Sequence, residues 1–230
     1  MYIILKYLDG DENTGFRAWS KLRSFHFFGK SVTYLYGMKP TYQSDQRILF
    51  VVMGNSTNMG LFHGFGFHGS GSFEKLDLVY MLPEVLFKIP FLRDLLLWSG
   101  AVKHDKNNIL NLLNKGKSIA YAPNGMKPKL ELPDVGILEL AHVNKIPVVP
   151  VCILDEEKRY KIFPSYKPLQ KWALNRYGWP FPYLFMYRWW NKTRPPNLRV
   201  KVGVPMDSSL YTDMEKFKEA FLGQLGIEEV

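Results

Sequence analysis

Short apolar runs alternate with segments of helical periodicity along most of the chain, and this alternation limits the fold more than any other feature. The runs predicted to form strands are Arg47–Val52, Leu76–Met81, Ser118–Ala122, Val148–Leu154 and Leu198–Val204. Strands that alternate with helices are typical of βαβ units, in which the strands are parallel. We therefore predict an α/β fold with one mostly parallel sheet flanked by helices.

The segments around these runs carry helical patterns. They are Phe16–Leu35 (amphipathic and basic, one surface helix or two short ones), Pro83–Gly100 (divided at Pro90), Lys106–Lys115, Gly136–Asn144 and Asp213–Leu225. Gly116 is the predicted C-terminal cap of the third segment, since glycine readily adopts the left-handed conformation found there. The sequence shows no internal repeat and no domain boundary, so we predict a single domain over residues 1–230.

Composition limits the class of protein. A hydrophobic fraction of 47% in 230 residues is ample for a core, and the net charge of +9 indicates an anionic partner, either nucleic acid or acidic lipid. No stretch reaches 18 uncharged apolar residues, and the start lacks the pattern of a signal peptide, so we expect no spanning helix. Cys152 lies in an apolar run and is predicted to be a buried core thiol. A chain with one cysteine has no intramolecular disulfide and fits a reducing compartment.

The range Lys158–Lys201, called here the basic aromatic segment, holds eleven Lys and Arg, twelve aromatic residues and no Asp or Glu. Basic residues attract anionic headgroups, and Trp and Tyr favour the membrane interface, so this composition predicts a membrane-docking face. A solvated basic loop with core aromatics and a nucleic-acid site are the alternatives. The run YGWPFPYLFMYRWW is too apolar and too often interrupted by proline for a regular base-stacking platform, so we expect no nucleic acid.

Five segments, in this order, resemble those of a known family. They are RAWSKLRSF, FKIPFLRDLLLWSGAV, SIAYAPNGMKPKLE, GILELAHVNKIPVVPVCIL (with its "(V/I)P" strand) and FPYLFMYRWWNKTRPPNLRVKVGVPMD (with its "G-x-P-(I/M)" end). Together they resemble the glycerolipid acyltransferase superfamily of lysophospholipid and glycerol-phosphate acyltransferases, nearest the type 2 diacylglycerol and the monoacylglycerol acyltransferases. The resemblance covers about Phe16 to Asp207 and implies an acyltransferase-like α/β fold.

The resemblance also implies a catalytic histidine. Such enzymes use a His, paired with an acid, as the general base that takes the proton from an acceptor hydroxyl. In this chain the corresponding place, Met53–Asn58, contains neither His nor acid. His63 and His68 follow shortly in an H-x4-H spacing and are the candidate catalytic residues. The alternative is that both histidines pack against aromatic residues or lie at the membrane interface.

Substrate-binding residues are expected in two loops that follow predicted strands. The candidates are Asn55, Asn58, Asn124, Gly125, Lys127 and Lys129. The two lysines would hold a phosphate or the CoA moiety as point charges, unless the loop is an ordinary solvated turn. His104 and Asp105 are predicted to lie on the surface, and His26 and His142 to be structural. No metal-ligand cluster and no nucleotide-binding motif is present in the sequence, so acyl-CoA as co-substrate is the expected requirement and no cofactor is predicted.

These features predict an acyltransferase that moves an acyl chain from acyl-CoA to a glycerolipid or related lipid alcohol. It would be peripheral or monotopic on a cytosol-facing membrane surface, such as that of the endoplasmic reticulum, with membrane lipid and acyl-CoA as its partners. The alternative is a catalytically inactive acyltransferase-like protein that binds lipid or a partner protein.

Overall fold

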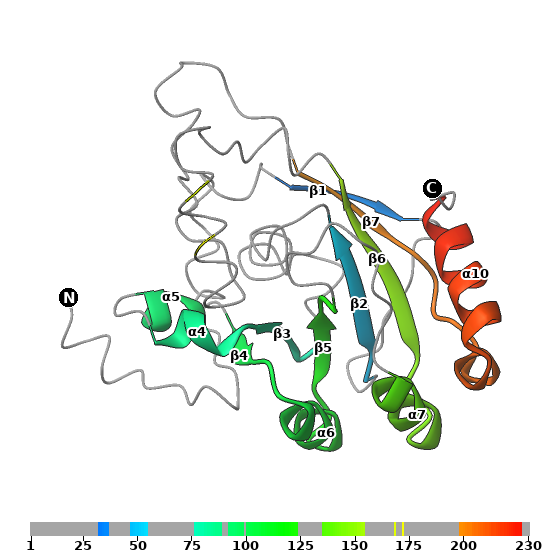
Figure 1. Ribbon diagram of the computed structural model, residues 1–230, viewed down its shortest axis with the longest axis horizontal. Helices are drawn as coiled ribbons and strands as arrows, with labels where there is room; N and C mark the ends of the chain where they lie inside the picture. Colours follow the sequence, from blue (N-terminus) through cyan, green and yellow to red (C-terminus); the bar gives the residue numbers. More distant parts are fainter. Residues whose placement is uncertain are drawn as a thin grey trace, which may run out of the picture.

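A computed structural model describes residues 32–36, 47–54, 76–88, 92–98, 100–123, 135–154, 168, 172 and 198–226. Seven strands form one sheet in the order β1-β7-β6-β2-β5-β3-β4 (Figure 1). They are β1 (Val32–Tyr36), β2 (Leu49–Gly54), β3 (Leu78–Leu82), β4 (Ala101–Lys103), β5 (Ser118–Tyr121), β6 (Val148–Leu154) and β7 (Leu198–Val202). Neighbouring strands are parallel except β6 and β7, which are antiparallel. The prediction of an α/β fold with a mostly parallel sheet is confirmed.

Helices cover both faces of the sheet. Two short ones, α4 (Glu84–Phe87) and α5 (Leu92–Trp98), pack on one face. On the other face lie α6 (Lys106–Asn114), α7 (Val135–Val143) and α10 (Met214–Leu225), with the 3-10 helix η5 (Ser208–Thr212). The connection from β3 to β4 uses the first face, and the connections from β4 to β5 and from β5 to β6 run the opposite way along the sheet over the second face. All three crossovers therefore have the same hand, as expected for parallel strands.

Most predicted elements are found within two or three residues of their expected bounds. β6 has the predicted range, and Cys152 within it is buried, as expected. α6 ends as predicted, because Gly116 has a φ of 80° and its N–H donates to the carbonyl of Leu113. The next N–H, that of Lys117, donates to the carbonyl of Leu112 and completes the cap.

Two strands were not predicted. The helix expected over Phe16–Leu35 is wrong at its end, because β1 begins at Val32 and pairs with β7. Val32, Thr33 and Tyr34 favour strands, and the ladder to β7 adds hydrogen bonds that an isolated helical turn cannot match. β4 has only three residues, which is too short to show a period of two in the sequence.

Two segments quoted for the family resemblance meet at the antiparallel pair. Pro150, in the middle of β6, accepts a 2.8 Å hydrogen bond from the N–H of Gly203, which follows β7. A proline has no N–H to donate, and here the ladder to β7 ends beside it, so the missing donor costs no strand pairing. A Cβ on Gly203 would lie 2.6 Å from Cγ of Pro150 and 2.5 Å from Oε1 of Gln224. Glycine is therefore required at this close approach.

Tyr211 in η5 fixes the start of β6. Its hydroxyl accepts a 2.7 Å hydrogen bond from the N–H of Val148 and lies 3.1 Å from the carbonyl oxygen of Met206. The ring contacts Phe217 of α10 edge to face, with centroids 5.8 Å apart. Burial, together with the charge of Asp207, raises the pKa of the Tyr211 hydroxyl to about 12, against the lowering effect of the Val148 hydrogen bond. The phenol is therefore a neutral structural anchor at the amino edge of β6.

Candidate functional site

The centre of the sheet defines one edge at which a ligand can bind. β2 and β5 are parallel neighbours, with Leu49 beside Ile119 and Val51 beside Tyr121. Their carboxyl ends, at Gly54 and Tyr121, therefore lie at the same edge. We call this place the β2–β5 edge.

The chain leaves these two strands in opposite directions along the sheet. The strand that follows β2 is β3, on the far side of β5, whereas the strand that follows β5 is β6, on the far side of β2. In open α/β sheets, ligands bind at the carboxyl ends of strands where the direction of winding reverses, because the two connections diverge there and leave a crevice. The winding also reverses between β5 and its other parallel neighbour β3, since β6 follows β5 on one side and β4 follows β3 on the other, so the carboxyl ends of β2, β5 and β3 lie together at this reversal.

The site residues predicted from the sequence follow these same two strands. One group comes after β2 (Asn55, Asn58, His63 and His68), and the other comes after β5 (Asn124, Gly125, Lys127 and Lys129). All eight lie outside the described residues, so their positions relative to one another stay a prediction. The strand order shows where each group begins, because the two groups follow strands whose last residues, Gly54 and Tyr121, lie at one edge of the sheet.

Two described side chains, those of Tyr121 and His104, lie next to this edge. Tyr121, the last residue of β5, is 6% exposed, and its ring stacks on the imidazole of His104 with centroids 5.1 Å apart and planes 21° apart. His104 follows β4, and its backbone N–H donates a 2.9 Å hydrogen bond to the carbonyl of Leu82, which extends the pairing of β3 with β4. The exposed imidazole is thus held at the carboxyl edge of the sheet and reaches past the end of β3 to β5.

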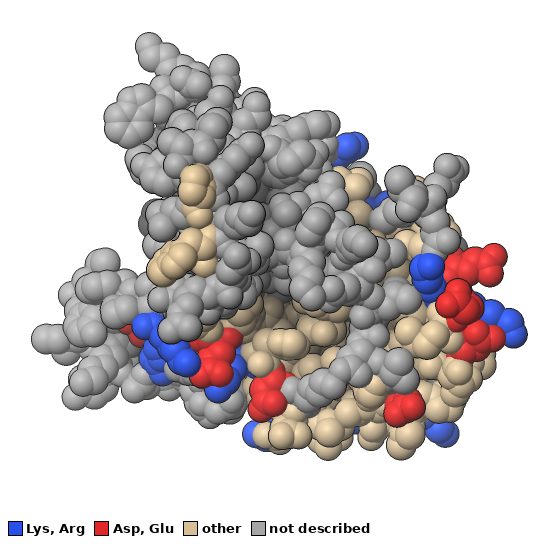
Figure 2. Space-filling model, viewed as in Figure 1, with Lys and Arg blue, Asp and Glu red and all other residues tan. Residues whose placement is uncertain are grey.

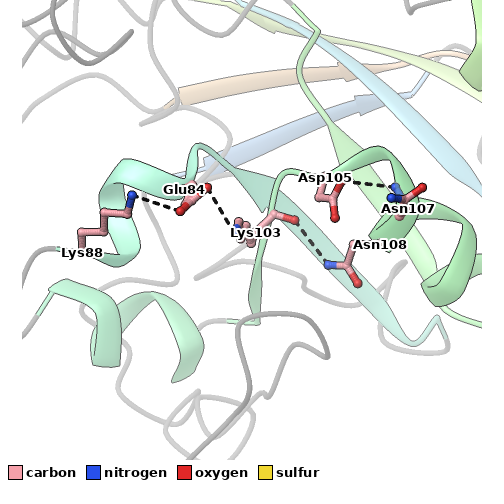
Figure 3. Close-up of polar contacts among 6 residues, drawn as sticks. All are labelled: Glu84, Lys88, Lys103, Asp105, Asn107 and Asn108. Atoms are coloured by element: carbon pink, nitrogen blue, oxygen red, sulfur yellow. Dashed lines mark hydrogen bonds and ion pairs between the residues drawn. The ribbon is translucent and has the colours of Figure 1, made fainter.

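On the face of the sheet that α4 covers, charged groups near the end of β4 are paired with one another (Figure 3). Glu84 accepts from Nζ of Lys88 at 3.0 Å and from Nζ of Lys103 at 3.2 Å. Hydrogen bonds from Lys88 and then Lys103 lower the pKa of the Glu84 carboxyl, so it is ionised at neutral pH. Each carboxylate oxygen therefore has a cationic partner, and both lysines have an anionic one.

Asp105 is also engaged. Its carboxylate accepts a 3.3 Å hydrogen bond from the backbone N–H of Asn107 and caps the N-terminus of α6. Figure 3 shows the Asp105 side chain directed towards Asn107, while the Asn108 amide reaches the carbonyl of Lys103. His104 and Asp105 are both exposed, which confirms the predicted surface position. The partner of the Asp105 carboxylate is therefore the backbone N–H of Asn107 at the start of α6.

The stack of His104 on Tyr121 is the feature that sequence reasoning missed. The two residues belong to different predicted segments, and no periodicity links them. The sequence signal that was available is the position of each residue at the end of a strand, since parallel strands end at a common edge. His142, by contrast, is half-buried on α7 and lies edge to face with Tyr211 at 6.5 Å, as its predicted structural role requires.

The basic aromatic segment is described at few positions. Trp172 is 56% exposed, and Lys201 at the segment's end donates a 2.7 Å hydrogen bond to the carbonyl of Leu225, which satisfies the C-terminus of α10. In Figure 2 the described basic and acidic side chains lie interspersed over the α4–β4 region and over α10. No described helix combines the length and apolar character needed to cross a bilayer. Membrane docking by this segment stays a prediction.

Comparison with known proteins found similarity to solved structures. No family model matches the sequence, and no curated protein matches it. The fold is similar to that of the 1-acyl-sn-glycerophosphate (LPA) acyltransferase PlsC from Thermotoga maritima, with a TM-score of 0.46 and 16% sequence identity over 99% of this chain and 81% of that chain. Identity at this level is too low to transfer site residues between the two proteins.

Proposed function

We propose that this protein is a membrane-surface acyltransferase that moves an acyl chain from acyl-CoA to a glycerolipid or related lipid alcohol. The observation that carries the proposal is the adjacency of the parallel strands β2 and β5, whose carboxyl ends lie at one edge of the sheet where the direction of winding reverses. The two loops that the family resemblance marks as catalytic and substrate-binding begin at the carboxyl ends of these two strands. The sheet order and the motif order therefore agree on a single site.

In the proposed reaction, His63 or His68 is the general base. The imidazole takes the proton from the acceptor hydroxyl while its oxygen attacks the carbonyl carbon of the thioester. The carbon–oxygen bond forms, the carbon–sulfur bond breaks, and the thiolate of CoA leaves with the proton that the imidazole returns. Lys127 and Lys129 would neutralise anionic groups of the donor, and Asn55, Asn58, Asn124 and Gly125 would hold the polar parts of the substrates.

The basic aromatic segment supports the proposed location at a membrane surface. Eleven cationic side chains without a single acid would draw the protein to an anionic, cytosol-facing membrane, such as that of the endoplasmic reticulum. Its aromatic residues would then lie at the interface where acceptor and acyl chain enter. The expected partners are therefore membrane lipid and acyl-CoA.

Purified protein on anionic liposomes, supplied with labelled acyl-CoA and mono- or diacylglycerol, tests the proposal. We expect labelled acylglycerol product, and we expect turnover to fall by at least about 100-fold when His63 and His68 are both changed to Ala, since general-base catalysis contributes that much. The matched control is His142→Ala. This change removes a histidine of α7 that contacts Tyr211, at the edge of the sheet opposite the carboxyl ends of β2 and β5. Turnover that is unchanged in the double variant would refute the assignment of the base.

A second candidate function rests on one specific observation. The segment Met53–Asn58, where the resemblance places the catalytic histidine, contains neither His nor acid. A catalytically inactive protein that binds lipid or a partner would have this feature. Flotation with anionic vesicles but no product with any acyl-CoA would favour this second function, and failure to float would contradict both the acyltransferase and the lipid-binding function.

A further inference from the structure

We propose that the exposed side of the sheet's amino edge is a docking surface for an acidic segment of a partner protein, with Lys145 as its central cation. The surface, called here the amino-edge surface, comprises Arg47, Lys115, Lys117, Val143 and Lys145. These residues lie where α6 and α7 end and where β2 and β5 begin, opposite the β2–β5 edge. None of them is assigned to the proposed acyl transfer.

The helices α6 and α7 end in the same cap, with a different residue at its left-handed position. In α7, the N–H of Lys145 donates to the carbonyl of His142 at 3.0 Å. The next N–H, that of Ile146, donates to the carbonyl of Ala141 at 2.8 Å, so this cap repeats the one that ends α6. The left-handed residue is Gly116 in α6, with a φ of 80°, and Lys145 in α7, with a φ of 52°.

A lysine at this position costs stability. In the left-handed conformation a Cβ crowds the following carbonyl oxygen, and glycine avoids this contact. Among the described residues, Lys145 is the one non-glycine residue with a positive φ, and its side chain is exposed. The cap of α6 shows that glycine serves the same turn. Residues held in such conformations cluster at functional sites, so the lysine indicates a contact that the glycine could not make.

The two caps lie on either side of the start of β2. The guanidinium of Arg47 donates to the carbonyl of Leu113, in the last turn of α6, at 3.5 Å. The N–H of Leu49 donates to the carbonyl of Pro147, just after the cap of α7, at 3.0 Å. The caps of both helices, and the cations on them, therefore belong to one continuous surface.

Positive charge is in excess on this surface. Its cations are Arg47, Lys115, Lys117 and Lys145, and the described acids beside them are Asp77 and Glu139. Asp77 is paired with Lys117 at 3.0 Å, whereas Lys115 and Lys145 are exposed and form no ion pair within the described part of the chain. A third acid, Asp207, follows the bridge to Val148 on the β7 side of β6 and caps η5. Figure 2 shows basic side chains along the margin of the molecule below α6 and α7.

An exposed apolar residue adjoins these cations. Val143, the last residue of α7, is 77% exposed, the largest value among the large hydrophobic side chains that the structure describes. Protein interfaces combine an apolar centre with a polar rim, and complementary charge across them selects the partner. A valine flanked by Lys145 and Lys115 therefore fits a segment that carries carboxylates around an apolar side chain.

An anionic bilayer fits this surface less well. The basic aromatic segment leaves the sheet after Leu154 and returns before Arg199, and these two residues pair at the carboxyl edge. Docking through that segment, as proposed above, would direct the amino-edge surface towards water. Two unpaired lysines also fall short of the roughly four to eight clustered cations of typical lipid-binding segments.

Lys145→Gly separates a contact role from a structural one. We expect its unfolding temperature to rise by about 1 to 4 °C, because glycine relieves the backbone strain. We also expect its affinity for an acidic peptide to fall by about 2- to 5-fold. The probe is a short labelled peptide rich in Glu and Leu, followed by fluorescence anisotropy, with Gln in place of Glu in the neutral control peptide. Lys115→Ala should weaken binding similarly without the gain in stability.

The matched control is Lys216→Ala, which removes an exposed lysine of α10 that is paired with Asp213. It should bind the peptide as the wild type does, and an equal loss in this variant would show attraction by net charge alone and overturn the inference. Peptide binding that is absent in the wild type or unchanged in Lys145→Gly overturns it as well. So does a Lys145→Gly protein no more stable than the wild type, because the lysine would then carry no strain.

Two further measurements distinguish other occupants and the proposed function. Flotation with phosphatidylserine vesicles, or dimerisation in sedimentation velocity, that is lost in Lys145→Gly while peptide binding is retained would assign the surface to a membrane or to a second copy, and either result overturns a protein partner. Acyl transfer should be unchanged in Lys145→Gly. If no acyl-CoA yields product while the peptide results hold, only the proposed function has failed.

Discussion

Two tyrosines in the same hydrophobic cluster mark opposite edges of the sheet, and they differ in what surrounds them. Tyr211 is 1% exposed at the amino edge of β6, and backbone groups of Val148 and Met206 satisfy its hydroxyl. Tyr121 is 6% exposed at the carboxyl edge, and its ring faces the exposed imidazole of His104. Similar burial of the same residue type therefore serves two different purposes.

The difference follows from the order of the strands. At the amino edge, β6, the chain after β7, η5 and α10 close on one another through short contacts between buried groups. At the carboxyl edge, the chain leaves β2 and β5 in opposite directions along the sheet, and the described residues that follow β4, His104 and Asp105, are exposed. We infer that changes to the buried groups at the amino edge lower stability with activity per folded molecule unchanged, whereas changes at the carboxyl edge alter substrate binding at a small cost in stability.

The largest effect is expected from Gly203→Ala at the amino edge. The new methyl would lie 2.6 Å from the Pro150 ring and 3.1 Å from its carbonyl oxygen, neither of which can move without shifting β6. We expect the free energy of unfolding, measured with urea, to fall by about 3 kcal/mol. Gly223→Ala in α10 is the matched control, because its methyl would meet nothing within 4 Å and should add about 0.5 to 1 kcal/mol. Equal effects of the two changes would show that the close approach to Pro150 does not limit this position.

The next effect concerns Tyr211 at alkaline pH. Its pKa is about 12 in the folded protein and about 10 in the unfolded chain, so between these values the unfolded chain releases a proton that the folded protein retains. The unfolded state is thereby favoured, and the stabilisation that is complete below pH 10 is lost as the pH rises towards 12. We expect a loss of about 1 to 2 kcal/mol over this interval, measured by urea unfolding.

Tyr211→Phe is the control for this pH dependence. Other groups also titrate above pH 10, so the test is the difference between the two proteins and not the slope of either one. At pH 7 the variant should be less stable by about 1 to 3 kcal/mol, because the N–H of Val148 is left buried without its acceptor. The gap between wild type and variant should then narrow above pH 10. A gap that stays constant to pH 12 would contradict the assigned cause.

The contrast between the two edges also explains what could be predicted from the sequence. The five predicted strands depend on local apolar runs, and the range Val148–Leu154 is predicted correctly because four of its seven residues are β-branched. β1 was mistaken for helix over Val32–Leu35, because its pairing with β7 joins segments far apart in the chain. The stack of His104 on Tyr121 depends on such distant pairing as well. The sequence places each residue at the end of a predicted strand, but it does not show that these two strand ends lie close together in the sheet.

The smallest effect in this series tests the cap beside His104. Asp105→Ala removes the acceptor for the N–H of Asn107, and we expect the free energy of unfolding to fall by about 1 kcal/mol. Asp105→Asn keeps a capping oxygen and should change stability by only a few tenths of that amount, while it removes the negative charge next to the imidazole. A loss in Asp105→Ala as large as that in Gly203→Ala would mean that the carboxyl edge also holds the fold together, and the distinction between the two edges would fail.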